Sequence, residues 1–378
     1  MKKRNWSYLF LYIFSFGGLG AFLPLLGQYL KLNGFTGTQI GTITSAGTAA
    51  AIFATTFWGR LYNSSANKKR FILKLIIAAA LFCASLYFVH SYILFLVLFC
   101  GLYSFQAPAM ALVDAMTIED GQVFGAARKW GAVGFALGVF FAGKVSEITG
   151  LHVIFFIYTG CFIIFAGIVC VMSAGNRGKI PTYSEKPDSL AKTDIYKNKR
   201  YIKLVICAFF INGTVVAHNT YFGFLFVHGG GSIAGIGLAF LLMAGSEAPF
   251  MAFAGKLSGA FTLEKTLFAA ICLSAIRFAW YSTYPSAHLL LFMFFLQGMS
   301  TGIALVEFVR YVAKIVDGTD LGIAISAYYA FGSSLSTIFC QLAGGIILDR
   351  FNAGGVYGFF SGMNLLGAFL YLFWKLYK

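Results

Sequence analysis

The chain has 378 residues, of which 59% are hydrophobic and 11% are charged, and it contains 43 phenylalanines. This composition excludes an ordinary soluble globular protein and indicates a protein that lies within a membrane. The formal net charge of +15 is compatible with nucleic-acid binding, but the charges fall in the connections between apolar segments, so we expect no nucleic-acid partner.

Apolar segments long enough to cross a bilayer recur along the whole sequence. A hydrocarbon core about 30 Å thick needs roughly 20 helical residues. Twelve such segments are predicted, at residues 6–30, 37–61, 71–89, 92–116, 128–148, 151–174, 201–227, 233–258, 266–284, 288–314, 321–344 and 354–374. We therefore expect an all-α membrane protein with twelve transmembrane helices, the first of which is too long to be a cleaved signal peptide.

One long polar break divides these segments into two groups of six. It covers residues 175–200 and contains Pro181 and Pro187 among mixed charges. We predict an N-terminal six-helix bundle at 1–174, a cytoplasmic linker at 175–200 and a C-terminal six-helix bundle at 201–378.

The basic residues predict the orientation of the chain. Most of them fall on the side of the membrane that holds both chain ends, and the other side has only Lys31, Lys144 and Arg350. Cytoplasmic loops carry such an excess of lysine and arginine. We therefore expect both termini in the cytoplasm and the protein in the bacterial cytoplasmic (inner) membrane.

A short sequence pattern recurs at the end of every third segment. In it, a glycine is followed two residues later by an aliphatic residue and four residues later by an acid or its substitute. Its copies are residues 59–63, 143–147, 255–259 and 345–349. Because three is odd, successive three-helix units have opposite orientations in the membrane, which is typical of secondary transporters built from inverted repeats.

Four charged residues lie inside apolar segments: Asp114, Arg128, Glu247 and Arg277. A charge at the bilayer centre costs about 2.5–3.5 kcal/mol on insertion scales, so such residues usually pair and mark a substrate or ion path. Asp114 and Arg128 are equally far from the connection between their segments, and so are Glu247 and Arg277. Equal helical arms bring partners to one depth, which predicts two acid–arginine pairs, one in each half.

These features resemble the major facilitator superfamily, whose fold has two six-helix halves with inverted three-helix repeats. Within it, several segments are similar to lactose-permease-type oligosaccharide:proton symporters and to phenylpropionate permeases. These segments are residues 16–20, 22–24, 34–35, 39–41 and 124–135, with Glu247 and Pro249. The resemblance covers nearly the whole chain.

The resemblance implies roles for individual residues. By position, Arg128 binds substrate, Phe135 replaces an aromatic residue that stacks on the sugar, and Glu247 contacts substrate and takes part in proton coupling. Arg277 matches an arginine tied to proton release.

Three positions depart from the lactose-permease pattern. The acid that partners the sugar-binding arginine aligns with Met110, the coupling histidine with Gln297 and the proton-carrying carboxylate with Ser300. Gln297 is accordingly expected to contact substrate, whereas galactoside specificity and that family's proton route do not carry over.

The residues themselves leave several alternatives open. Glu247 lies beside Pro249, which loosens a helix locally, so Glu247 suits a coupling or switching site as well as a structural ion pair with Arg277. His218 and Tyr221 share a helix face and either line a cavity or form interhelical hydrogen bonds. Asp114 is a candidate proton-coupling residue, a gate, a substrate ligand or a structural partner.

The sequence predicts no enzyme. Its seven cysteines have no metal-ligand spacing, and we expect no metal and no cofactor. A Gly-x-Ser-x-Gly pattern at 298–302 lies in a predicted apolar helix, not between a strand and a helix as a nucleophile elbow requires.

We predict a proton-coupled symporter that imports a small polar solute, a sugar, nucleoside or aromatic or organic acid, by alternating access. A proton-coupled exporter is the alternative within the same fold, and a non-transporting membrane sensor is the alternative of another class. The expected partners are the solute, protons and the lipid bilayer. Because one chain contains both halves, we expect a monomer.

Overall fold

The structure is a computed structural model that describes residues 6–174, 194–316 and 320–377. Most of the predicted linker, residues 175–193, lies outside these ranges. The first six crossings are single helices: α1 (Trp6–Leu32), α2 (Gly37–Ser64), α3 (Lys68–Leu86), α4 (Tyr92–Glu119), α5 (Phe124–Thr149) and α6 (Val153–Ala174).

The second half contains six further crossings. A short 3₁₀ helix, η1 (Asp194–Lys197), precedes α7 (Lys199–His228), α8 (Ile233–Phe261) and α9 (Leu263–Tyr281). The tenth crossing is built from α10 (Ala287–Phe292), α11 (Phe295–Gln297), η2 (Gly298–Gly302) and α12 (Ile303–Ile315), and the eleventh begins with α13 (Leu321–Ala327) and η3 (Tyr328–Leu335). Helix α14 (Ser336–Phe373) completes the eleventh crossing, turns at Asn352 and forms the twelfth. The prediction of an all-α protein with twelve transmembrane helices is confirmed.

Side-chain caps begin several of these helices. The Thr36 hydroxyl accepts a hydrogen bond from the Gln39 N–H, and the Gln39 side chain accepts one from the Thr36 N–H, which is a capping box before α2. Ser232 and Ser286 cap α8 and α10 in the simpler way. These caps satisfy backbone groups at helix ends, where they have no partner within the helix.

Two crossings of the second half contain π-helical turns, η2 and η3. A π turn widens the helix and leaves some backbone groups unpaired, and such turns occur frequently at functional sites. Asn352 has φ 56° and ψ −168°, a backbone conformation that residues other than glycine rarely adopt. This residue ends the eleventh crossing and reverses the chain.

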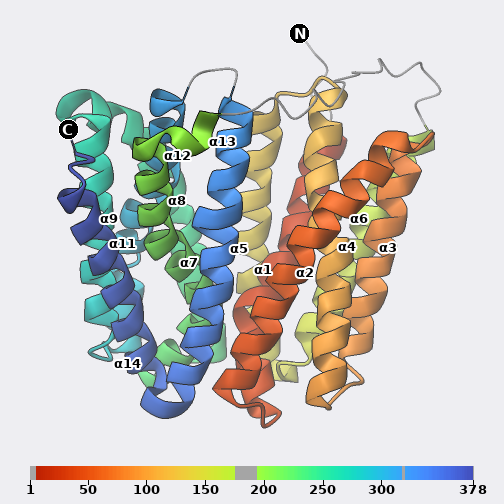
Figure 1. The fold of residues 1–378 in the computed structure, drawn as a ribbon. Coiled ribbons are helices and arrows are strands. Elements are labelled where there is room, and N and C mark those ends of the chain that lie inside the picture. Colours follow the sequence, from red (N-terminus) through yellow and green to blue (C-terminus); the bar gives the residue numbers. More distant parts are fainter. Residues whose placement is uncertain (1–5, 175–193, 317–319, 378) are drawn as a thin grey trace.

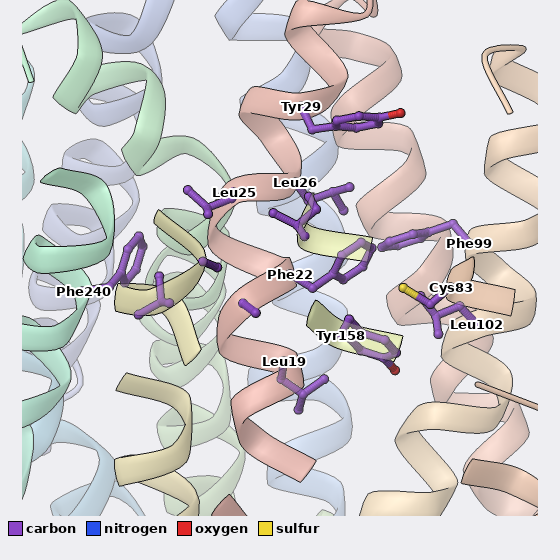
Figure 2. Close-up of a cluster of buried hydrophobic side chains, with 14 of the residues drawn as sticks. Leu19, Phe22, Leu25, Leu26, Tyr29, Cys83, Phe99, Leu102, Tyr158 and Phe240 are labelled. Atoms are coloured by element: carbon purple, nitrogen blue, oxygen red, sulfur yellow. The ribbon is translucent and has the colours of Figure 1, made fainter. Parts of the chain in front are cut away.

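Helix α1 lies in the centre of the bundle. Its Phe22 ring contacts Phe99 of α4 and Tyr158 of α6, and the same cluster includes Phe240 of α8 in the other half (Figure 2). On another face, a Cβ added at Gly138 of α5 would lie 2.1 Å from the carbonyl oxygen of Gly17. Glycine therefore permits α1 and α5 to pack with their backbones in contact.

The most extensive contacts between the two halves are those of α5 with α8, α2 with α14 and α1 with α7, and α2 also contacts η3. We call the end of the bundle where α1 begins and α14 ends the termini face, and the opposite end the far face. Helices α2 and α14 lie together at the far face and diverge toward the termini face (Figure 1).

The far face is closed by glycine contacts between the halves. A Cβ at Gly345 of α14 would lie 2.4 Å from the Gly37 oxygen of α2, and one at Gly237 of α8 would lie 2.6 Å from the Val139 oxygen of α5. Gly143 of α5 also faces the first turn of α8. Gly143 and Gly345 are the first residues of two copies of the repeated pattern.

The acid at the end of one copy explains why the pattern contains an acid. The Asp349 carboxylate accepts hydrogen bonds from the backbone N–H of Gly37 (2.5 Å), the backbone N–H of Thr38 (2.7 Å) and the Thr38 hydroxyl (2.7 Å). A carboxylate is stabilising at a helix N-terminus, where N–H groups and the helix dipole favour negative charge. Asp349 thus joins the second half to the start of α2 at the far face.

The two copies of the pattern at the termini face are in a different situation. A Cβ at Gly59 of α2 meets open space, and one at Gly255 of α8 reaches only the Arg310 side chain at 3.8 Å. The corresponding acid positions hold Asn63 and Gly259. The same sequence pattern therefore forms tight contacts at the far face and none at the termini face.

Candidate functional site

A polar cavity of about 250 Å³ lies at the interface between the two halves. Helix α1 contributes an apolar side with Leu23, Leu26 and Gly27. The hydroxyl, phenol and amide side chains come from α2, α4, α7, η3 and α14, and they are Thr44, Thr48, Tyr103, Asn219, Thr220, Ser333, Ser334, Thr337 and Gln341. We call this space the central cavity.

Among the residues that the structure describes, no aspartate, glutamate, lysine, arginine or histidine lines the central cavity. The Thr44 hydroxyl donates to the Ile40 oxygen of its own helix. The Thr48 hydroxyl donates to Oε1 of Gln341 at 3.2 Å and thereby joins α2 to α14. The cavity is thus a neutral site that can donate and accept hydrogen bonds.

The first predicted acid–arginine pair forms in the N-terminal half. Nε of Arg128 lies 3.6 Å from Oδ2 of Asp114, and the Tyr12 hydroxyl donates to Oδ1 of Asp114 at 2.7 Å. The guanidinium also lies 4.0 Å from the centre of the Phe16 ring, a cation–π contact. Both charged side chains are about one-third exposed, 37% for Arg128 and 30% for Asp114, so the pair is open to solvent or solute near the termini face.

The second predicted pair does not form in this conformation. Glu247 lies 14 residues before the end of α8 (261 − 247) and Arg277 lies 14 residues after the start of α9 (277 − 263), so both are at one depth. No ion pair within 4.0 Å joins the two side chains, and the Glu247 carboxylate interacts with Gln297 instead. The Arg277 guanidinium is directed over the Phe278 ring, 4.4 Å from its centre.

Arg277 is an unusual buried charge. Its exposure is 1%, and none of its three guanidinium nitrogens has a hydrogen-bond partner within residues 6–174, 194–316 and 320–377. The Tyr281 hydroxyl and Oε1 of Gln297 are also buried and unpartnered in these ranges. A buried polar group without a hydrogen-bond partner is costly in a protein interior. Several such groups close together are typical of a site whose polar groups exchange partners during function.

His218 and Tyr221 both form interhelical hydrogen bonds. Nδ1 of His218 lies 2.9 Å from the Tyr357 hydroxyl in an aromatic cluster. The Tyr221 hydroxyl donates to the backbone carbonyl oxygen of Gln341 at 2.5 Å. Neither side chain lines the central cavity, to which α7 presents Asn219 and Thr220. The sequence left open whether these side chains line a cavity or form interhelical hydrogen bonds. In this conformation they form the hydrogen bonds.

The other predicted site residues lie among packed side chains. Phe135 and Met110 are partly buried against the core around α1. Gln297 is buried at the start of the π turn η2, and the Ser300 hydroxyl donates to the Leu296 oxygen of its own helix at 2.8 Å. Arg128, Phe135, Glu247 and Gln297 are all absent from the lining of the central cavity.

The hydroxyl-rich lining of the central cavity was not predicted from the sequence, although the spacing of its polar residues indicates it. Thr44 and Thr48 are four residues apart, and so are Ser333, Thr337 and Gln341. Positions i, i+4 and i+8 fall on one helix face, and polar stripes of this kind in apolar helices indicate an interface or a cavity. Within the described ranges, no group of three or more His, Cys, Asp or Glu side chains could hold a metal ion.

Comparison with known proteins agrees with this architecture. The "MFS_1 like family", a division of the major facilitator superfamily, matches residues 5–359. The chain belongs to this family. It is 32% identical over 374 residues to a maltose permease of Geobacillus stearothermophilus, with 97% of this chain and 92% of the permease covered. It is 29% identical over 368 residues to the uncharacterized transporter YwbF of Bacillus subtilis (strain 168), with 96% and 91% covered.

Solved structures of transporters share the fold. The nucleoside transporter NupG superposes with a TM-score of 0.82 at 17% identity, covering 99% of both chains. A D-xylose–proton symporter superposes with a TM-score of 0.71 at 11% identity, covering 97% of this chain and 95% of the other. This protein is therefore an integral membrane transporter of the major facilitator type and not an enzyme, and the predicted family resemblance is confirmed.

Proposed function

We propose that this transporter couples proton movement to the uptake of a small polar solute by alternating access, with both termini in the cytoplasm. The observation that carries the proposal is the contrast between the two ends of the interface. At the far face the halves are joined by Gly345 against Gly37 and by the Asp349 cap, whereas Gly59 and Gly255 are free of such contacts at the termini face. This arrangement fits a carrier open toward the termini face.

Glu247 and Arg277 are the proposed coupling residues. The arginine is permanently charged and buried, whereas a glutamate can gain and lose a proton. Attraction between two charges is much stronger in a protein interior than in water. Protonation of Glu247 therefore removes a force between α8 and α9, which offers a way for one proton to change the relative position of these helices.

Arg128 and Phe135 remain proposed substrate contacts, outside the lining of the central cavity, that a solute meets on its way to that cavity, with Asp114 as the partner that Arg128 leaves when a solute arrives. Arg128 lies in the second turn of α5, on the open side of the interface, and Phe135 lies about two turns further along the same helix. His218, Tyr221 and Gln297 are proposed to exchange their present contacts for solute in another conformation.

The known similar proteins support solute uptake. A maltose permease is similar along nearly the whole chain, and proteins of the same fold are a nucleoside transporter and a D-xylose–proton symporter. These names favour a sugar or nucleoside over an aromatic acid. They also favour symport over the exporter alternative.

The direct test uses purified protein in liposomes, with internal pH recorded after addition of each solute. We expect a candidate sugar or nucleoside to enter together with protons when the outside is acidic, and the opposite gradient to drive the solute out. Solute movement that is unaffected by either pH gradient contradicts proton coupling, and proton flow opposite to solute flow identifies an exporter.

The repeat predicts where the termini face closes in the alternate state. At the far face, the pattern glycines pack against the first turns of α2 and α8. The equivalent first turns at the termini face belong to α13 and α5 and contain Gly322 and Gly125, beside which a Cβ would meet open space. We expect the double variant Gly59→Cys with Gly322→Cys to cross-link in the alternate state and thereby stop transport.

This cross-link is checked by oxidation in the presence and absence of transported solute, followed by an uptake assay and reduction. Reduction is expected to restore uptake, and each single-cysteine variant serves as control for the native cysteines. A double variant that transports at the unoxidised rate after oxidation contradicts the predicted closing contact.

The Asp114–Arg128 pair is tested by Asp114→Asn, which keeps the shape and removes the charge. Because exposed ion pairs contribute only about 0–1 kcal/mol, we expect little change in the free energy of unfolding. If Arg128 binds solute, the variant is expected to retain solute exchange with altered affinity, measured by labelled-solute exchange. Unaltered exchange affinity together with lower stability indicates a structural pair instead.

A further inference from the structure

Several polar side chains of the central cavity have no protein partner. Within the described ranges, no hydrogen bond is formed by the side chains of Asn219, Ser333, Ser334 or Thr337, or by Nε2 of Gln341. An asparagine and a hydroxyl can each both donate and accept. This mixture matches a solute with neighbouring hydroxyl groups, because each of those groups also donates and accepts.

The π turn η3 contributes two consecutive serines to the cavity. In an α-helix adjacent side chains point about 100° apart, whereas a π-helical turn is wider and changes this spacing. Ser333 and Ser334 both lie in η3 and both line the cavity. One and two turns later, Thr337 and Gln341 of α14 continue the same polar stripe.

The opposite wall suits the apolar face of a ring. Leu23 and Leu26 of α1 and Val216 of α7 line the cavity, and Gly27 brings the α1 backbone against the Thr220 oxygen of α7, which a Cβ would meet at 2.7 Å. Tyr103 of α4 adds an aromatic side chain. Sugars and nucleosides have both an apolar ring face and a polar rim, so the two walls of the cavity match two parts of one solute.

The lining has no charge to balance that of an anion. Moving an ionised carboxylate from water into such a site is costly without a partner, whereas a neutral hydroxyl group needs only hydrogen bonds. We propose that the central cavity binds a neutral polyhydroxylated solute, a sugar or a nucleoside, and excludes aromatic acids. This inference rests on the proposed transport function and assigns its substrate class to Asn219, Ser333, Ser334, Thr337 and Gln341.

The test is solute exchange in liposomes at equal pH on both sides, with unlabelled solute inside and its labelled form outside. The neutral probes are pentoses, hexoses, maltose and uridine, and the anionic probes are benzoate and 3-phenylpropionate. Exchange of at least one neutral probe without exchange of the anions is the expected result. Exchange of the anions alone, or of none of the neutral probes, overturns the proposal.

Variants then connect exchange to the cavity. Thr337→Val and the pair Ser333→Ala with Ser334→Ala are expected to raise the half-saturating concentration of the exchanged neutral probe roughly threefold to tenfold for each hydrogen bond lost. Thr56→Val and Ser326→Ala are matched controls, because these exposed hydroxyls donate only to their own helices. Wild-type affinity in folded cavity variants overturns the assignment.

The outcomes separate this inference from the proposed coupling. Exchange at equal pH needs no proton gradient, so a carrier without proton coupling still exchanges a neutral solute. Neutral exchange without proton uptake therefore contradicts only the coupling. Proton-coupled uptake of an anion, without neutral exchange, contradicts only the substrate class.

Discussion

Replacing Glu247 with glutamine is expected to abolish solute accumulation driven by a pH gradient while solute exchange continues. Glutamine has nearly the same shape as a protonated glutamate but cannot gain or lose a proton. The variant therefore permanently resembles the state in which Glu247 is protonated and no ionic attraction acts between α8 and α9. Solute can still bind and the halves can still move, but the proton gradient no longer determines the direction of movement.

Two assays on the same liposomes check this prediction. Gradient-driven accumulation is expected to fall to the background of protein-free liposomes, whereas exchange at equal pH is expected to stay within a few-fold of wild type. Glu307→Gln is a matched control, because Glu307 is a fully buried glutamate of the same half that pairs with Arg310 at 2.8 Å, away from Arg277. Wild-type accumulation by Glu247→Gln would falsify the coupling role.

Replacing Gly345 with leucine is expected to prevent closure of the far face. A Cβ at this position would lie 2.4 Å from the Gly37 oxygen and 3.0 Å from the Gly41 Cα, so even the first atom of a side chain separates α14 from α2. Overpacking costs typically about 1–3 kcal/mol, which lowers the population of the closed state roughly fivefold to 150-fold. In the proposed alternating-access cycle both faces close in turn, so the rate of transport is expected to fall accordingly.

The same substitution is expected to open the cavity to the far side. A cysteine at Thr44, which lines the cavity on α2, then reacts faster with a membrane-impermeant maleimide added at the far face. Gly362→Leu on α14 is the matched control, because a Cβ there meets nothing within 4 Å. Normal transport by Gly345→Leu, with unchanged labelling, contradicts a closing role for this contact.

The architecture could be predicted because it depends on properties that a bilayer imposes on each segment separately. A chain in hydrocarbon must satisfy its backbone hydrogen bonds within a helix, so segment length and hydropathy are enough to predict α1 to α9. The same method cannot detect the π turns η2 and η3. A local change of helical register depends on what packs against the helix.

Spacing along the chain correctly predicted both the depth and the contact of Asp114 and Arg128. For Glu247 and Arg277 it correctly predicted the depth but not the contact. Connection length and helical rise determine depth, and both pairs do share a depth. Whether partners touch depends on rotation about each helix axis and on competing neighbours. Arg277 lies over Phe278, and Glu247 interacts with Gln297.

The amino-acid sequence alone was sufficient for the class of protein, the number of crossings, the repeat and the depth of the buried charges, because these follow from composition, length and spacing along one chain. The central cavity depended on folding. Its lining comes from residues as far apart as Leu23 and Gln341, and a polar stripe on one helix does not indicate which other helix it faces. A cavity is a relation between helices from both halves, so it exists only once α1, α2 and α4 lie against α7, η3 and α14.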